Sequence, residues 1–157
     1  MGSHSKNDLA YISGFLDGDG SLMLQIKKYK YNKSGKRFMV TICFYQDSRH
    51  DKPLYWIRKI FGIGYISKRN DGITELRING YSRVRIILEK LLPFIKFKKK
   101  QARILYKASK LLEKEKKLKK TSMIRLVDYI VRIQEENYVT RKKRSKDDLL
   151  KFLGLTP

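Results

Sequence analysis

The stretch that decides the fold is Leu9-Ala-Tyr-Ile-Ser-Gly-Phe-Leu-Asp-Gly-Asp-Gly20. Asn7 or Asp8 can cap a helix that begins at Leu9 and ends near Asp17, where two glycines and a serine interrupt the pattern. Bulky side chains recur along one side of this helix, and this spacing suits packing on a sheet. They are Leu9, Ile12, Phe15 and Leu16.

The opposite side of this helix carries small side chains, at Ala10, Ser13, Gly14 and Asp17. A glycine inside a helix costs about 1 kcal/mol relative to alanine, so Gly14 needs a reason. A face of small residues allows another backbone to approach closely.

Downstream, the apolar period changes to two, which predicts strands over residues 21–31 and 36–46 and a second hairpin over 65–69 and 73–79. Each strand has one apolar face and one polar, basic or aromatic face. Further helices are predicted over 53–61, from a cap at Ser82 to Pro93, and over 94–112, 122–137 and 145–153.

The predicted order is helix-strand-strand-helix-strand-strand-helix with added C-terminal helices, which makes an α+β fold. Its antiparallel sheet is covered by helices on one face only. Residues 6–157 are expected to form a single domain with a helical tail from about 121. Met1-Gly-Ser-His-Ser5 resembles a remnant of cloning, and the prediction sets it aside.

The charge is strongly unbalanced: 37 Lys and Arg against 15 Asp and Glu give a net +22. With 41% hydrophobic residues, the chain can build one core, which excludes disorder and a fibrous repeat. No long apolar run or secretion signal is present, so we expect an intracellular protein that does not enter a membrane. Cys43 is the only cysteine, which excludes an internal disulfide.

Nucleic acid is the leading partner for such a charge. A basic surface that is merely solvated is the alternative, and an anionic membrane surface ranks third. The uncovered sheet face offers donors for phosphates and base edges. Its predicted DNA-binding residues are Gln25, Lys27, Tyr29, Tyr31, Arg37, Met39, Thr41, Ser67, Arg69, Glu75 and Arg77.

Two carboxylates, Asp17 and Asp19, follow the first helix. The carbonyl end of a helix is negative, so a carboxylate there is disfavoured by about 0.3–1 kcal/mol. A hard cation such as Mg²⁺ would reverse that penalty, because it prefers carboxylate and carbonyl oxygens. The other interpretation is an ordinary Asp-Gly loop.

Taken together, Ile12-Ser-Gly-Phe-Leu-Asp-Gly-Asp-Gly20, Phe44-Tyr-Gln46, Phe61-Gly-Ile-Gly-Tyr65 and Pro93-Phe-Ile-Lys-Phe-Lys-Lys-Lys-Gln-Ala102 resemble the LAGLIDADG homing endonucleases. The resemblance covers roughly residues 8 to 112. The chain contains only one such motif. It therefore resembles the branch of the family whose members have a single motif and act as homodimers. The resemblance implies a site-specific endonuclease that cuts double-stranded DNA.

The resemblance also implies roles for individual residues. Asp19 would be the metal ligand, assisted by the carbonyl of Gly18, and Asp17 would cap or orient the helix end. Gln46 would order active-site water, and Lys98 would lie near the cleaved phosphate. A further basic position falls near Arg49 or His50. Motif helices of two copies would pack through the small face, which comprises Ala10, Ser13, Gly14 and Asp17.

A strand of about 10 residues spans about 33 Å, or about 10 base pairs, so two subunits would read about 20 base pairs. Two alternatives remain open, namely a splicing cofactor that binds intron RNA and a DNA-binding regulator that does not cut. The basic run Arg141-Lys-Lys-Arg144 either touches flanking phosphates or is solvated.

Overall fold

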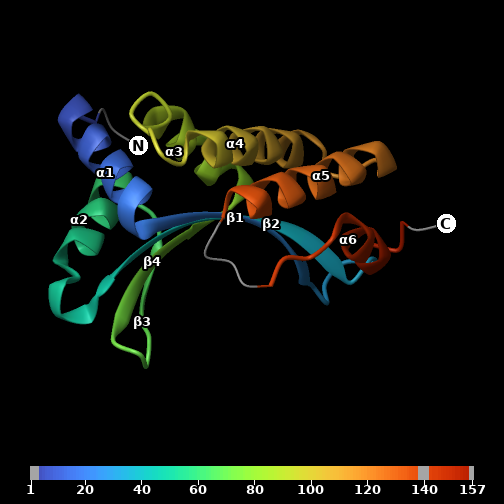
Figure 1. The fold of residues 1–157 in the computed structure, drawn as a ribbon, viewed down its shortest axis with the longest axis horizontal. Coiled ribbons are helices and arrows are strands. Elements are labelled where there is room, and N and C mark those ends of the chain that lie inside the picture. Colours follow the sequence, from blue (N-terminus) through green and yellow to red (C-terminus); the bar gives the residue numbers. More distant parts are fainter. Residues whose placement is uncertain (1–3, 138–141, 156–157) are drawn as a thin grey trace.

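The computed structural model describes residues 4–137 and 142–155. Figure 1 shows most of the helices on one face of a curved sheet, with the C-terminal helix beside the far end of the sheet. The elements run in the order α1 Lys6–Asp19, β1 Gly20–Lys28, β2 Lys36–Asp47, a 3-10 turn Ser48–His50, α2 Lys52–Phe61, β3 Tyr65–Lys68, β4 Ile73–Asn79, α3 Tyr81–Leu91, α4 Lys99–Lys114, α5 Lys120–Glu136 and α6 Lys146–Phe152. This confirms the predicted α+β fold.

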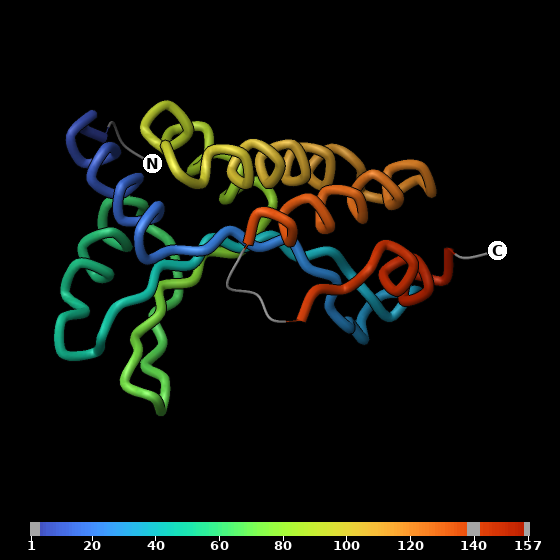
Figure 2. Tube along the Cα trace, in the orientation of Figure 1, coloured from blue at the N-terminus to red at the C-terminus, as the bar shows by residue number. Residues whose placement is uncertain are grey.

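The sheet has the strand order β1-β2-β4-β3, with every neighbouring pair antiparallel. Strand β2 lies in the centre, so that Phe44 pairs with Gly20 of β1 and with Leu76 of β4. Helices α3, α4 and α5 contact these strands from one side. We call the other side the open face. The tube in Figure 2 shows that the sheet is bent along its length.

One core joins the sheet to the helical layer, because the apolar alternation of the strands faces the apolar stripes of the helices. Ile12 and Leu16 of α1 are fully buried, as are Ile42 and Phe44 of β2. Fully burying a side chain of this size contributes about 1.5–3 kcal/mol. None of the described helices is long and apolar enough to cross a membrane.

The first helix begins earlier than predicted. Its cap is Ser5, whose hydroxyl accepts the backbone N–H of Asp8 at 3.0 Å, so the predicted cap at Asn7 or Asp8 is wrong. Setting Ser5 aside as a cloning remnant hid this signal. The helix also continues through Gly18 to Asp19, because Gly20 and not Gly18 provides its C-cap.

The segment predicted as the start of the fourth helix is also different. Residues 94–98 do not begin a continuous helix, and α4 starts only at Lys99. The reason is a tertiary contact, since the backbone N–H groups of Lys96, Phe97 and Lys98 donate to Asp17 instead of to a helix. Similarly, α3 is capped by Gly80 and not by the predicted Ser82.

Strand β1 ends at Lys28, three residues before the predicted end at Tyr31. There the backbone N–H of Tyr29 bonds to the carbonyl of Gly35 at 2.7 Å and starts the turn of the hairpin. The predicted C-terminal helix is confirmed as α6, and Ser145 caps it, since its hydroxyl accepts from the N–H of Asp148 at 3.1 Å. Residue Arg141 of the predicted basic run lies outside the described residues.

Gly20 joins α1 directly to β1, and a substitution at this junction tests the fold. A Cβ at Gly20 would lie 2.8 Å from the carbonyl oxygen of Leu16 and 2.9 Å from its Cα. We expect Gly20→Ala to lower the free energy of unfolding by about 1–3 kcal/mol, because backbone atoms must move. Ser21→Ala is the neighbouring control and loses only a partly buried hydroxyl, so its cost should stay below about 1.5 kcal/mol. Urea denaturation compares both, and equal stability of Gly20→Ala and the unmodified chain would contradict the close approach.

Candidate active site and nucleic-acid interface

The end of α1 carries the candidate site. Asp17 and Asp19 lie on either side of Gly18 in the last turn, which contains no basic residue. Asp19 and Gly18 are exposed, whereas Asp17 is partly buried. The helix carbonyls and the Asp19 carboxylate therefore place negative charge at one solvent-accessible point.

Asp17 holds the chain before α4 against the end of α1. Its carboxylate accepts three backbone N–H groups, from Lys96 at 2.8 Å, Phe97 at 3.1 Å and Lys98 at 2.9 Å. Burial alone would raise the pKa of Asp17, but the three N–H donors together lower it. The side chain is therefore turned toward its own chain and not outward, as its place on the predicted small face implied.

Lys98 lies across the same helix end. Its Nζ donates to the carbonyl oxygens of Leu16 at 3.1 Å and Asp17 at 2.5 Å. Burial lowers the pKa of Lys98, although the carboxylates of Asp17 and Asp19 act against this shift. The structure thus brings the predicted basic residue Lys98 to the predicted acidic residue Asp19.

Gln46 lies at the same end of the sheet, two residues beyond the pairing of Phe44 with Gly20. Its side-chain oxygen accepts the N–H of Asp47 at 2.9 Å, so its amide nitrogen remains to orient another group. Arg49 forms an ion pair with Asp47 at 2.8 Å, and this arginine lowers the pKa of Asp47. His50 is exposed. Which of the two acts at the site stays a prediction.

The outer side of α1 is formed by Ala10, Gly14 and Gly18, which are exposed and spaced four residues apart. A Cβ at Gly14 or Gly18 would meet nothing within 4 Å, so the chain itself has no packing reason for either glycine. The prediction that Ser13 belongs to this face is wrong. Ser13 is fully buried, and its hydroxyl donates to the carbonyl of Leu91 at 3.2 Å.

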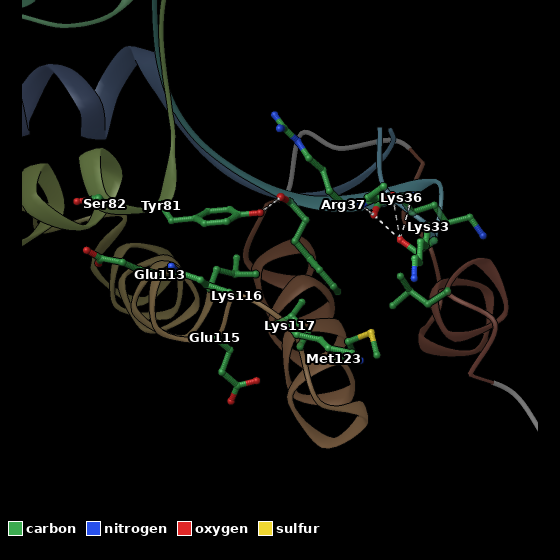
Figure 3. A pocket seen from close by; sticks show the side chains of 16 residues that line it. Lys33, Lys36, Arg37, Tyr81, Ser82, Glu113, Glu115, Lys116, Lys117 and Met123 are labelled. Atoms are coloured by element: carbon green, nitrogen blue, oxygen red, sulfur yellow. Dashed lines mark hydrogen bonds between the residues drawn. The ribbon is translucent and has the colours of Figure 1, made fainter. Parts of the chain in front are cut away.

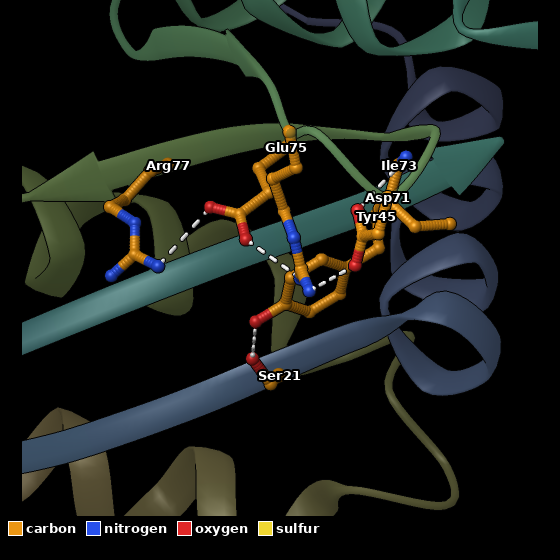
Figure 4. Close-up of polar contacts among 7 residues, drawn as sticks. Ser21, Tyr45, Asp71, Ile73, Glu75 and Arg77 are labelled. Carbon is orange, nitrogen blue, oxygen red and sulfur yellow. Dashed lines mark hydrogen bonds and ion pairs between the residues drawn. The ribbon is translucent and has the colours of Figure 1, made fainter. Parts of the chain in front are cut away.

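The open face carries a connected set of charges at the end near α1. Glu75 accepts from Arg69 at 3.1 Å and from Arg77 at 3.2 Å, and Arg69 also binds Asp71 at 2.5 Å. Figure 4 shows this network beside the pair formed by Ser21 and Tyr45, whose hydroxyl oxygens are 3.0 Å apart. Burial chiefly raises the pKa of Tyr45 to about 12, so this phenol remains a neutral donor. Ser67 faces Glu75 across β3 and β4.

Contrary to the prediction, the structure does not place Thr41 as an exposed residue of the open face. It is fully buried, and its hydroxyl donates to the side-chain oxygen of Asn79 at 2.6 Å. Because β2 is the central strand, Met23 and Asn79 flank Thr41 on both sides and help to cover it. It cannot contact a base edge from this position. Cys43 is likewise buried, and burial raises its thiol pKa, which disfavours a nucleophilic role.

Toward the other end of the open face, β1 and β2 present further predicted contacts. Gln25 pairs with Met39, and both are partly exposed. Lys27 pairs with Arg37, and both are exposed. The guanidinium of Arg37 lies 4.7 Å from the centre of the Tyr29 ring, which also contacts Tyr31 edge to face. These two tyrosines belong to the turn and not to the strand.

A C-terminal segment extends this surface, and it is held by contacts that no local sequence pattern predicts. The side-chain amide of Gln134 bonds twice to the backbone of Arg144, at 2.9 Å and 3.1 Å. Phe152 of α6 lies between the cations of Lys36, at 4.4 Å, and Arg144, at 4.7 Å. Lys142 and Arg144 line a hollow of about 310 Å³ with Gln25 and Lys27. The partners are distant in sequence, so periodicity could not find them.

A larger hollow of about 970 Å³ lies under the hairpin tip, between α3, the end of α4 and α6. Figure 3 shows its lining, which includes Lys33, Lys36, Lys116 and Lys117. Its two carboxylates are already engaged, Glu113 by Arg85 and Glu115 by Ser122. It is not the acidic site, which lies at the end of α1.

The residues at the end of α1 fit a divalent cation. Asp19 and the Gly18 carbonyl offer the hard oxygen ligands that Mg²⁺ prefers. Within the described residues, however, no three Asp, Glu, His or Cys side chains converge to hold a metal ion. Asp19 and the Gly18 carbonyl are thus the oxygen ligands that the end of α1 offers to such an ion.

An antiparallel sheet with charged donors on its open face, next to a helix that ends in an exposed carboxylate, has the chemistry of a protein that contacts nucleic acid. The sequence model of the LAGLIDADG endonuclease family matches residues 12–108, and the chain belongs to this family. This confirms the resemblance inferred from the motifs.

Two relatives show how far the similarity extends. The DNA endonuclease I-CvuI of Chlorella vulgaris is 32% identical over 113 residues, which cover 72% of this chain and 70% of the relative. The DNA endonuclease I-CreI of Chlamydomonas reinhardtii is 28% identical over 148 residues, which cover 91% of this chain and 87% of the relative.

The crystal structure of I-CvuI with the I-CreI target and Mg superposes with a TM-score of 0.83 at 26% identity, covering 95% of this chain and 96% of that chain. The structure of I-CvuI with its own target and Ca also superposes with a TM-score of 0.83, at 25% identity, and covers 96% of this chain and 97% of that chain. The similarity therefore extends over nearly the whole of both chains.

The carboxylate of Asp17 gives a pH prediction. Its pKa is lowered in the folded chain, so its contribution to stability is complete above its unfolded pKa and is lost as the pH falls through the folded value. We expect Asp17→Asn to destabilise the chain by about 1–3 kcal/mol near neutral pH, because backbone N–H groups lose acceptors. The difference should shrink from about pH 5 to about pH 2. Urea denaturation across this range measures it. A pH-independent difference would mean that the charge of Asp17 is not what matters.

Proposed function

We propose that this chain is a site-specific DNA endonuclease that acts as a homodimer on a long, pseudo-palindromic duplex and requires Mg²⁺. The observation that carries the proposal is the exposed Asp19 carboxylate at the negative end of α1, beside Lys98 and at the edge of an open, basic sheet face. The names of I-CvuI and I-CreI, both DNA endonucleases, support the proposed reaction.

The open face is proposed as the DNA surface. Its strands present arginines, lysines and amides that can bond to base edges in the major groove, while flanking lysines bind phosphates. Complexes of I-CvuI with DNA in the presence of Mg or Ca support a duplex and a divalent cation as partners.

The homodimer is proposed from α1. Gly14 and Gly18 cost helix stability, and nothing in the described chain approaches them closely enough to need a glycine. A second α1 packed on this side would explain both residues and would bring the two Asp19 carboxylates together. This arrangement would supply the ligands that one chain lacks.

The residues then divide the work of phosphodiester hydrolysis. Asp19 and the Gly18 carbonyl would hold Mg²⁺, which supplies activation of water and charge stabilisation at the leaving oxygen when bound. The ammonium of Lys98 would offset negative charge that develops on the phosphate. Gln46 would orient water with its amide, and Asp17 would keep Lys98 in place through the backbone.

The first test is Asp19→Asn. We expect cleavage to fall by at least about 10³-fold, equivalent to about 4 kcal/mol of transition-state stabilisation, because a metal ligand is lost. Duplex binding in Ca²⁺ should remain within about threefold, since Asp19 is not on the open face. A randomised duplex library incubated with Mg²⁺, Ca²⁺ or EDTA provides the assay. Undiminished cutting by the variant would refute the metal assignment.

The same assay separates the other functions. Specific duplex binding without cutting in Mg²⁺ would indicate a regulator. Tight binding to structured intron RNA with little duplex affinity would indicate a splicing cofactor, and either result would overturn the proposed activity.

The second test is Gly14→Leu. We expect the chain to stay folded, with stability changed by less than about 1 kcal/mol, because an exposed helical glycine is replaced by a good helix former. The dimer should be lost, and cleavage with it. Sedimentation equilibrium gives the oligomeric state. The matched control is Glu135→Leu, which adds a leucine at an exposed position of α5 and should remain dimeric. If the unmodified protein is a monomer on its duplex, the proposed assembly is wrong.

A further inference from the structure

The helical layer carries a row of cations that the proposed DNA surface does not use. Arg103, Lys107, Lys110 and Lys114 are exposed and follow one another along α4 at intervals of three or four residues. This spacing places them on one side of the helix. We call these four residues the α4 row.

The α4 row points away from the sheet. The opposite side of α4, which includes Ala102, Leu105 and Ala108, is fully buried, and α4 contacts β1 and β2. Figures 1 and 2 show α4 in the helical layer, running away from α1. A duplex on the open face therefore cannot reach the row, and neither can a partner helix packed on α1.

Three other cations of the helical layer have acidic partners within the chain. Lys100 pairs with Glu136 at 2.5 Å, and Lys146 pairs with Asp128 at 2.8 Å. Arg85 pairs with both Glu89 and Glu113. Among the described residues, no ion pair reaches any member of the α4 row. Two acids lie near its end: Glu113 is held by Arg85 on α3, and Glu115, which caps α4 beside Lys114, accepts the hydroxyl of Ser122.

Such a row is unfavourable for the isolated chain. Like charges one turn apart destabilise a helix by about 0.2–0.5 kcal/mol per pair. A surface that serves only solubility usually mixes both signs of charge. The arrangement becomes favourable when a polyanion lies along the helix and releases its condensed counterions.

We propose that the α4 row binds the phosphates of a second DNA duplex while the open face holds the first. This inference rests on the proposed function, since it requires a first duplex. At about 1.5 Å per residue, the row is about 16 Å long. One strand of a duplex carries a phosphate every 3.4 Å or so of its axis, which places about five phosphates along this length.

The chemistry of the row favours a duplex over a single strand. Proteins that hold single strands stack the bases on aromatic side chains. The four residues of the row contain no aromatic ring on which a base could stack, and their charges can bond to the phosphates of a backbone. Binding at the row therefore rests mainly on phosphate contacts and weakens with salt. Two duplexes held together would allow the protein to pass from one DNA segment to another during its search for a target.

The experiment uses the full chain bound to an immobilised duplex of about 60 base pairs in Ca²⁺, which is then offered a fluorescent duplex of unrelated sequence. The test variant carries Arg103→Gln, Lys107→Gln, Lys110→Gln and Lys114→Gln. A charge-matched control carries Lys6→Gln, Arg58→Gln, Lys59→Gln and Arg132→Gln, which lie on three other helices. A third variant, with Lys107→Arg, Lys110→Arg and Lys114→Arg, keeps the charge of the row.

We expect the unmodified chain, the matched control and the arginine variant to capture the second duplex, and the test variant to capture it at least tenfold more weakly. The slope of log affinity against log salt should fall by up to about 3.6 in the test variant. Cleavage of the first duplex in Mg²⁺ should be unchanged. Equal capture by the test variant, an equal loss in the matched control, or capture of structured RNA in place of duplex would each overturn the inference. Failure to bind the immobilised duplex would instead count against the proposed function.

Discussion

The rest of the site depends on one carboxylate that gathers three backbone N–H groups. Asp17 accepts from Lys96, Phe97 and Lys98, and these bonds tie the chain before α4 to the end of α1. The same contact stops α4 from starting earlier, and it turns the Lys98 side chain onto the last carbonyls of α1. Two neighbouring acids thus have different tasks. Asp17 is used inside the chain, which leaves Asp19 as the exposed carboxylate, the proposed metal ligand.

The distribution of charge follows from this division. Acids inside the helical layer and on the open face are mostly committed to particular cations, as Glu75 is to Arg69 and Arg77. Asp19 is placed where helix carbonyls disfavour a carboxylate, and the ammonium of Lys98 is the nearby charge that acts against this. The excess of positive charge, +22 overall, is left for external polyanions. The few carboxylates are therefore divided between ion pairs that stabilise the chain and the exposed Asp19.

The sequence predicted much of this molecule, because local patterns determine its strands, hairpins and helices. Periodicity alone was enough for the sheet with one open face, and the acidic turn of α1 pointed to Asp19. The errors came from contacts between distant residues. Ser13 and Thr41 have the spacing of exposed positions, but Leu91 and Asn79 engage them in the fold. The clasp of Gln134 on Arg144 spans separate elements, and no local pattern reports it.

The shared acid on the open face limits how such a protein can acquire a new target. Glu75 holds Arg77 of its own strand with one carboxylate oxygen and Arg69, just after β3, with the other, so replacing either arginine leaves one oxygen of Glu75 without its partner. If the open face reads DNA as proposed, the base preferences set by these two arginines are coupled through Glu75, and retargeting proceeds in blocks and not one position at a time. Laboratory selection would have to randomise the three residues together to reach specificities that stepwise substitution passes by.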